Sequence, residues 1–205
     1  MSSATTSKNG FDVHYRTIDL VTIATLGVAF GVIFWGWNKA YEPLSDLAVF
    51  GYPPSSALLA GVWLTAGVAG GLIVRKPGAA LATEVIAAAV SLVVIGGNQW
   101  GFSTLASGFW QGLGAELVFL LLFYRRFGVV VAALAGLVAA SFEAVYEWSS
   151  YYPDWGFGYK LAHLGFFGLS GIVIAGVGTY FLIRALARTG VLDAFGPGRE
   201  QAVEV

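Results

Sequence analysis

The amino-acid sequence predicts an all-α, polytopic membrane protein with six transmembrane helices and with the N and C termini cytoplasmic. Three observations lead to this prediction. Of the 205 residues, 57% are hydrophobic and only 11% are charged, whereas soluble domains carry about 25% charged residues. Long apolar runs recur without the alternation that barrel strands would show. Basic residues follow every second run, which is the pattern that orients helices in a membrane.

Six segments are predominantly apolar over roughly the 17–25 residues that a helix needs to cross a bilayer. Helices are expected because lipid offers no hydrogen-bond partners to the backbone. The third segment is short and the sixth is long, so we expect tilt, or a sixth helix that leaves the bilayer. The predicted spans are residues 20–37, 57–74, 79–95, 104–124, 128–146 and 161–187.

The spans divide the chain into three parts. Residues 1–19 form a predicted cytoplasmic N-terminal segment, residues 20–187 a six-helix transmembrane domain, and residues 188–205 a cytoplasmic C-terminal tail. The first segment is polar and carries Asp12 and Asp19 before any apolar run, so it does not resemble a cleavable signal peptide. No internal repeat is apparent, and no soluble domain fits in the remaining residues.

The orientation follows from the basic residues, which concentrate on the cytoplasmic side of membrane proteins. If the spans alternate in direction, only Lys39 and Lys160 fall on the opposite side. The basic residues that share the predicted cytoplasmic side are Lys8, Arg16, Arg75, Lys76, Arg125, Arg126, Arg184 and Arg188.

The three predicted outer connections, residues 38–56, 96–103 and 147–160, are rich in aromatic and amide side chains. With Glu143 just below them, they carry two lysines against five carboxylates, which gives −3 at the outer side. An acidic, aromatic-lined mouth suits an organic cation, because the faces of aromatic rings attract cations. The alternative interpretation is an aromatic belt at the membrane interface.

Two carboxylates, Glu84 and Glu116, lie within predicted spans. A charge at membrane depth is costly, so it usually faces the protein interior and has a function. Glu116 follows Gln111 and lies deeper, and we expect it to supply the main polar recognition of a ligand. Glu84 starts nearer the cytoplasmic end, where a structural hydrogen bond or a partner contact is an equal alternative.

Polar or aromatic residues recur at helical spacing on four spans, near the same outer surface. One shared outward-facing pocket explains this pattern better than four coincidences. A single histidine within the spans, His163, is also explained as a satisfied core residue. The four sets are Glu84, Ser91 and Asn98; Glu143, Tyr146, Glu147 and Ser150; Lys160, His163, Phe167 and Ser170; and Phe34, Trp37, Asn38 and Tyr41.

Small residues form a stripe on the first span. Ala24, Gly27 and Gly31, with Ala29 beside them, are spaced as in helices that approach one another closely. We take Ala24, Gly27 and Gly31 as the candidate docking surface for a partner subunit.

Several functions are excluded or disfavoured. The sequence has no GxxxxGK[ST] motif for ATP, no HExxH motif, and only two histidines and no cysteine, so we expect no metal site and no cofactor. No Ser/His/Asp set supports an enzyme. The net charge of −1 gives no basic field for nucleic acid. The lipid bilayer is the expected surrounding, and the cell membrane the expected location.

Several segments resemble one family. RKPGAALATEVIAA, the turn Asn98–Gly101 and QGLGAELVF, with the shorter AYEP, GVW and TGVL, are similar to the YkoE-like substrate-binding subunits (S components) of energy-coupling-factor (ECF) vitamin transporters. The resemblance implies a six-helix subunit that captures thiamine or its hydroxymethylpyrimidine precursor. It also implies a transmembrane coupling subunit and two cytoplasmic ATPases as partners. The outer segment EWSSYYPDWGFGYK departs from the family pattern.

The residues and the resemblance together predict the substrate-binding subunit of a vitamin importer. The runner-up is a stand-alone channel or facilitator for small organic cations, and a membrane enzyme is third. The candidate ligand contacts are Glu116, Gln111, Asn98, Glu84, Tyr146, Glu147, Trp37, Trp63, Tyr159 and His163.

Overall fold

The computed structural model describes residues 13–94 and 97–204. Lys8, Asp12 and Ile95, which entered the predictions of orientation, signal sequence and third span, lie outside the described residues. Within the described part of the chain the secondary structure is helical throughout. The helices are α1 (Thr17–Ser45), η1 (Ala48–Phe50), η2 (Pro53–Leu64), α2 (Thr65–Val74), α3 (Ala79–Val93), α4 (Ser103–Leu121), α5 (Val129–Ser150), α6 (Phe157–Ser170), η3 (Gly171–Gly178), α7 (Thr179–Ala187) and α8 (Gly196–Glu204).

Every predicted span corresponds to a helix, which confirms the all-α class of the fold. Five helical stretches among the described residues are long and apolar enough to cross a membrane, and α3 is a shorter apolar helix of 15 residues. The second span joins the 3₁₀-helix η2 to α2, and the sixth joins α6, the π-helix η3 and α7 into one stretch of 31 residues. The short third span and the long sixth span agree with the sequence.

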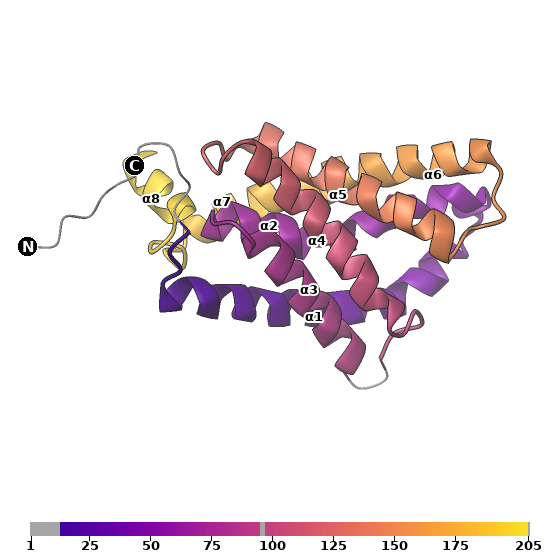
Figure 1. Ribbon diagram of the computed structural model, residues 1–205, viewed down its shortest axis with the longest axis horizontal. Helices are drawn as coiled ribbons and strands as arrows, with labels where there is room; N and C mark the ends of the chain where they lie inside the picture. Colours follow the sequence, from indigo (N-terminus) through magenta and orange to yellow (C-terminus); the bar gives the residue numbers. More distant parts are fainter. Residues whose placement is uncertain (1–12, 95–96, 205) are drawn as a thin grey trace, which may run out of the picture.

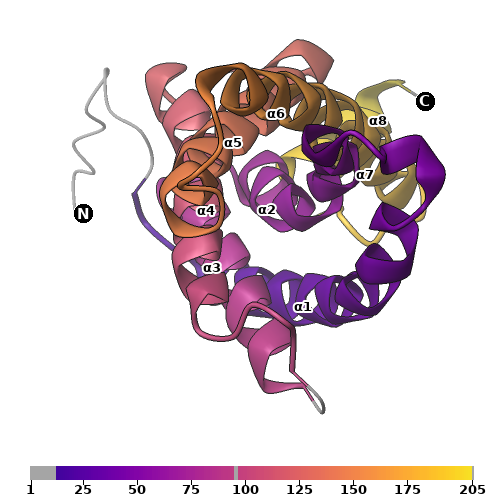
Figure 2. The same ribbon diagram turned by 90° about the vertical axis from the view of Figure 1, so that its right-hand side faces the viewer.

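The helices pack around α2. Along the outside, α1 contacts α3, α3 contacts α4, α4 contacts α5, and α5 contacts α6 and η3. Viewed along the bundle in Figure 2, α2 lies inside this arrangement. Its residues from Ala66 to Val74 are all buried, and three glycines at positions 67, 70 and 71 allow its neighbours to approach closely.

The two ends of the bundle differ. One end, which we call the basic end, carries Arg16, Lys76, Arg125, Arg126 and Arg184, and α8 lies against it (Figure 1). The opposite end, which we call the loop end, carries η1 and the α3–α4 and α5–α6 connections. The C-terminal residues expected as a tail include α8 and two buried side chains, Leu192 and Phe195.

The structure contradicts the prediction that Gly27 and Gly31 dock a partner subunit. Both glycines are buried against α3. A Cβ atom on Gly27 would lie 2.5 Å from Ile86 Cγ2, and one on Gly31 would lie 2.5 Å from Val90 Cβ. The small residues therefore serve the contact of α1 with α3 inside the chain. Ala24, one turn before Gly27, is exposed.

Candidate ligand-binding site

A cavity with an empty volume of about 460 Å³ lies between α1, η2, α3, α4 and α5. Three of the four polar faces expected from the sequence meet here, with Glu84 and Ser91 on α3, Glu143 and Glu147 on α5, and Phe34 and Asn38 on α1. The fourth expected face, with Lys160, His163, Phe167 and Ser170 on α6, does not line the cavity. The residues that line it are Phe34, Asn38, Trp63, Glu84, Ala88, Ser91, Trp100, Thr104, Ser107, Gly108, Gln111, Glu143, Glu147 and Tyr151. Four of the predicted ligand contacts, Glu84, Gln111, Trp63 and Glu147, are among them.

Glu84 lies at the deep end of the cavity. Its side chain is 1% exposed, and its Oε2 atom accepts a hydrogen bond of 2.6 Å from the backbone N–H of Gly67 on α2. Its Oε1 atom has no hydrogen-bond partner among the described residues. A buried carboxylate oxygen without a donor is costly, so this atom is suited to accept a hydrogen bond from a ligand.

Glu143, across the cavity on α5, is equally buried. It interacts with the side chains of Ser107 and Gln111 on α4, and its Oε2 atom has no hydrogen-bond partner in the described part of the chain. Two helices, α3 and α5, thus each present one unpaired carboxylate oxygen to the same cavity.

Glu147 lies one turn above Glu143 and is paired. Its Oε2 atom is 3.1 Å from His163 Nε2, and the imidazole packs edge-on against Tyr152, Trp155 and Phe167. Tyr152 belongs to the α5–α6 connection, where burial raises the pKa of its hydroxyl and the Glu147 carboxylate adds to the effect. His163 therefore contacts the carboxylate of Glu147 but does not itself line the cavity.

The ionisable side chains of the cavity are mainly acidic. The cavity contains Glu84, Glu143 and Glu147, and no lysine or arginine of the described residues lines it. Carboxylates in a low-dielectric site bind a cation strongly because solvent screening is weak there. The described residues hold no group of three or more His, Asp or Glu side chains arranged for a metal ion. The arrangement suits an organic cation or a ligand that donates several hydrogen bonds.

An aromatic wall closes the loop end of the cavity. The rings of Tyr41 and Trp63 are 4.9 Å apart, and those of Trp63 and Trp100 are 5.1 Å apart and nearly perpendicular. Trp63 Nε1 donates a hydrogen bond of 2.8 Å to Asn38 Oδ1, which fixes the indole between η2 and α1. Such rings provide faces on which a flat heterocycle can stack and a cation can rest.

Asn98 does not share a face with Glu84 and Ser91, because α3 ends at Val93. Its Oδ1 atom instead accepts hydrogen bonds from the backbone N–H groups of Trp100 and Gly101 at 3.1 and 3.0 Å and from the Thr104 hydroxyl at 3.0 Å. Asn98 thereby shapes the turn that places Trp100 and Thr104 in the cavity wall. It does not line the cavity itself.

Glu116 lies away from the cavity, contrary to the sequence-based expectation. Its carboxylate accepts hydrogen bonds from the backbone N–H groups of Gly78 at 2.6 Å, Ala80 at 2.9 Å and Leu81 at 3.2 Å, and from the Tyr124 hydroxyl. These N–H groups form the first turn of α3, where helical donors lack internal partners. Glu116 is a helix cap at the basic end, supplied by a neighbouring helix.

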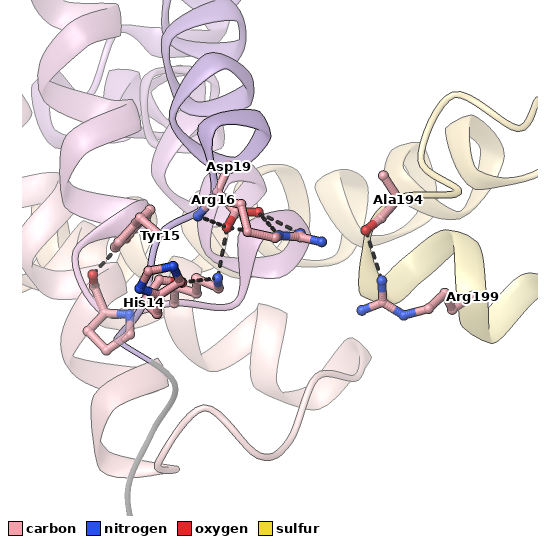
Figure 3. Close-up of polar contacts among 8 residues, drawn as sticks. His14, Tyr15, Arg16, Asp19, Ala194 and Arg199 are labelled. Carbon is pink, nitrogen blue, oxygen red and sulfur yellow. Dashed lines mark hydrogen bonds and ion pairs between the residues drawn. The ribbon is translucent and has the colours of Figure 1, made fainter. Parts of the chain in front are cut away.

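A second polar cluster secures the basic end. Lys76 Nζ contacts Asp19 Oδ2 at 2.7 Å, and Arg16 Nη2 contacts Asp19 Oδ1 at 2.6 Å (Figure 3). The Tyr15 hydroxyl donates to the Pro77 carbonyl at 2.7 Å. Burial raises the pKa of Tyr15 to about 12, and the carboxylates of Glu116 and Asp19 contribute to the rise. These contacts tie the start of α1 to the α2–α3 turn.

The remaining predicted contacts also lie outside the cavity. Trp37 donates from Nε1 to the Leu59 carbonyl at 3.1 Å, which joins α1 to η2. Tyr146 lines a separate surface groove together with Trp110. Tyr159 is 42% exposed and packs on Tyr52, with ring centroids 5.2 Å apart.

Several cavity residues were not selected from the sequence. Asn38, Ser91 and Glu143 belong to the helical patterns but were not among the candidate contacts, whereas Trp100 and Tyr151 carry no pattern that separates them from ordinary polar or interfacial residues. Ser107 lies four residues before Gln111 on α4, so the helical spacing from a chosen residue was the available signal.

Comparisons with known proteins agree with this architecture. Residues 18–142 match the family described as "ABC-type cobalt transport system, permease component". The chain is 31% identical over 187 residues to YkoE of Bacillus subtilis (strain 168), which is named as an HMP/thiamine permease protein, and the match covers 91% of this chain and 92% of YkoE. A crystal structure of an S-component of an ECF transporter superposes with a TM-score of 0.85 at 30% identity, covering 93% of this chain and 95% of that one. The chain therefore belongs to the S components of the ECF transporters. These S components are multi-pass membrane proteins that work with transmembrane coupling and ATPase subunits.

Proposed function

We propose that this S component captures thiamine or its hydroxymethylpyrimidine precursor. The observation that carries the proposal is the pair of unpaired carboxylate oxygens, on Glu84 and Glu143, in a cavity that has aromatic walls and no lysine or arginine in its described lining. The name of YkoE as an HMP/thiamine permease protein supports the same ligand class.

Both rings of thiamine have a counterpart in the cavity. The aminopyrimidine carries N–H groups that can donate hydrogen bonds to Glu84 Oε1 and Glu143 Oε2, and the Gln111 amide can donate to or accept from the edge of the ring. Trp63 and Trp100 offer faces for stacking the ring. The positive thiazolium is attracted by the three carboxylates and by the aromatic rings.

We further propose that the loop end faces the outside of the cell and the basic end the cytoplasm. The support is the concentration of arginine and lysine at the basic end, which is the cytoplasmic pattern. In this orientation the aromatic wall of the cavity faces the medium, and the ligand enters past Trp63 and Trp100 when these rings move apart.

Titration calorimetry of the purified protein tests the ligand class. We expect saturable binding of thiamine or hydroxymethylpyrimidine, and no binding of riboflavin, a neutral aromatic vitamin of larger size. A protein that binds neither pyrimidine compound, while its native fold is intact by circular dichroism, would contradict the proposal.

A further inference from the structure

The chain ends in a strap that folds over the basic end of the bundle. Leu192 and Phe195 are 6% and 5% exposed and belong to the hydrophobic core. The short helix α8 begins directly after Phe195 with the buried residues Gly196, Pro197 and Gly198, and it lies at the same end as the start of α1 (Figure 1). The buried pair anchors the strap, and α8 lies beyond this anchor.

Arg75 clamps α8 to the bundle. Its Nη1 and Nη2 atoms contact Glu200 Oε1 and Oε2 at 2.5 and 2.8 Å, a paired geometry that suits guanidinium and carboxylate. Its Nε atom donates to the Leu72 carbonyl at 3.0 Å, and its guanidinium carbon lies 4.3 Å from the centre of the Phe127 ring.

The backbone of Arg75 indicates that this side chain has a specific role. Arg75 ends α2 with φ +59° and ψ +36°, the left-handed conformation in which glycine is the usual residue. An arginine is strained there. Its guanidinium also passes directly over Gly196, where an added Cβ would collide with Arg75 Nη1. The conformation and the missing side chain at position 196 together allow the clamp.

The strap is weakly held beyond its anchor. Gly196, Pro197 and Gly198 are buried, but the rest of α8, REQAVE, offers little apolar surface, and the Glu200 side chain is 58% exposed. Ion pairs with exposed members contribute little to stability. On α8 itself, Arg199 Nη1 donates to the Ala194 carbonyl at 2.8 Å, a contact inside the strap (Figure 3).

A groove with an empty volume of about 410 Å³ remains between the strap and the bundle. Its bundle side is apolar, with Leu72, Phe127, Ile183 and Ala187, and it also carries the two cations Arg75 and Arg184. Glu200 is the acidic side chain that the strap supplies to these cations. An apolar surface with a paired cation fits an amphipathic helix that bears a carboxylate.

We infer that α8 is a releasable cover, and that the groove beneath it accepts a helix of the coupling subunit carrying an acidic side chain in the place of Glu200. The strap then competes with the partner for Arg75. Detachment begins after the buried run Gly196–Gly198, while Leu192 and Phe195 stay in the core. The inference rests on membership of the ECF S components and does not depend on which ligand the cavity binds.

Release of the strap can be measured with cysteine labelling, because the native chain has no cysteine. Gln201 lines the groove, and we expect Gln201→Cys to react slowly with a maleimide. Arg75→Gly should speed the reaction several-fold, since glycine keeps the left-handed backbone and removes only the clamp. Asp193→Cys, on the anchoring turn, is the control and should react equally in both backgrounds. Equal rates at position 201 with and without Arg75 would overturn the clamp.

Competition is tested by association with the coupling subunit and its ATPases, co-expressed and purified. A chain that ends at Phe195 should associate several-fold more tightly than the full chain, and Arg75→Gly in that shortened chain should remove the gain. Glu200→Gln in the full chain should give part of the same gain, which keeps the test decisive if the shortened chain does not fold. Association that is unchanged or weaker in the shortened chain and in Glu200→Gln would overturn the inference. Thiamine binding is not used in this test, so its result does not bear on the ligand.

Discussion

The carboxylate of Glu84 and the backbone N–H of Gly67 are joined by a hydrogen bond of 2.6 Å between α3 and α2. This bond uses only Oε2, and Oε1 stays without a partner among the described residues. Gly67 permits the approach, since a Cβ there would lie 3.1 Å from Oε2. The innermost helix of the bundle therefore orients the carboxylate that faces the cavity.

The contact of α1 with α3 makes Gly27 and Gly31 sensitive to substitution. Gly27→Leu or Gly31→Leu should destabilise the fold by at least about 1–3 kcal/mol, because the new side chain overlaps Ile86 or Val90. Thermal unfolding in detergent measures the loss. Gly36→Leu is the control on the same helix, since its Cβ would meet nothing within 4 Å. Variants that fold and bind ligand normally but fail to assemble with the coupling subunit would restore the docking role.

The aromatic wall predicts a graded effect on affinity. Trp63→Leu should weaken thiamine binding by about 0.5–2 kcal/mol, roughly 2- to 30-fold, because it removes a ring face next to the cation. Tyr159→Leu should leave binding unchanged, since Tyr159 lies outside the cavity. Calorimetry on both variants checks this. A larger loss for Tyr159→Leu would move the site toward the α5–α6 connection.

The proposed orientation predicts which single cysteines an impermeant reagent reaches in intact cells. Asp154→Cys at the loop end should be labelled, and Arg126→Cys at the basic end should react only after the cells are opened. Both side chains are exposed in the structure. If the reagent labels position 126 in intact cells and does not label position 154, the proposed orientation is wrong.

Strap docking should depend on pH. The hydrogen bond from Arg75 holds the pKa of Glu200 below its usual range, and the nearby charges of Arg199 and Arg184 act in the same direction. A lowered folded-state pKa means that the docking energy is present above the ordinary glutamate pKa of about 4.3 and is lost as the pH falls through the lowered value. The mobility of a nitroxide at position 201 should rise over that acidic range. In Glu200→Gln the mobility should be high at every pH, and a parent profile equally flat would contradict the clamp.

The sequence was sufficient for the spans because hydropathy decides which segments can enter lipid. It was not sufficient to distinguish Glu84 from Glu116. The antiparallel packing of α3 on α4 puts both carboxylates in the half of the bundle nearer the basic end. The two side chains therefore differ in the direction in which they point and not in their depth along the bundle. Glu84 faces the cavity, and Glu116 faces the first turn of α3. One signal was present: α3 begins after Gly78, which offers no capping side chain, so its N–H groups need an acceptor from elsewhere.

The glycines of α1 show the same limit. A stripe of small residues predicts that two helices pack closely, but it does not identify the helix that packs against the stripe. Here α3 occupies Gly27 and Gly31, because Ile86 and Val90 on α3 match their spacing. The pocket itself was predictable as a convergence of polar faces, whereas Trp100 and Thr104 reach it only through the turn that Asn98 holds.

Titration of purified Glu84→Gln and Glu116→Gln with thiamine, followed by tryptophan quenching, tests the central claim most directly. Both changes keep the side-chain shape and remove the charge. Glu84→Gln should weaken binding by about 1.5–3 kcal/mol, roughly 10- to 150-fold, because it removes a charged acceptor from the cavity. Glu116→Gln should bind like the parent and unfold at a lower temperature, because it weakens the cap of α3. If Glu116→Gln loses affinity while Glu84→Gln binds like the parent, the cavity described here is not the ligand site.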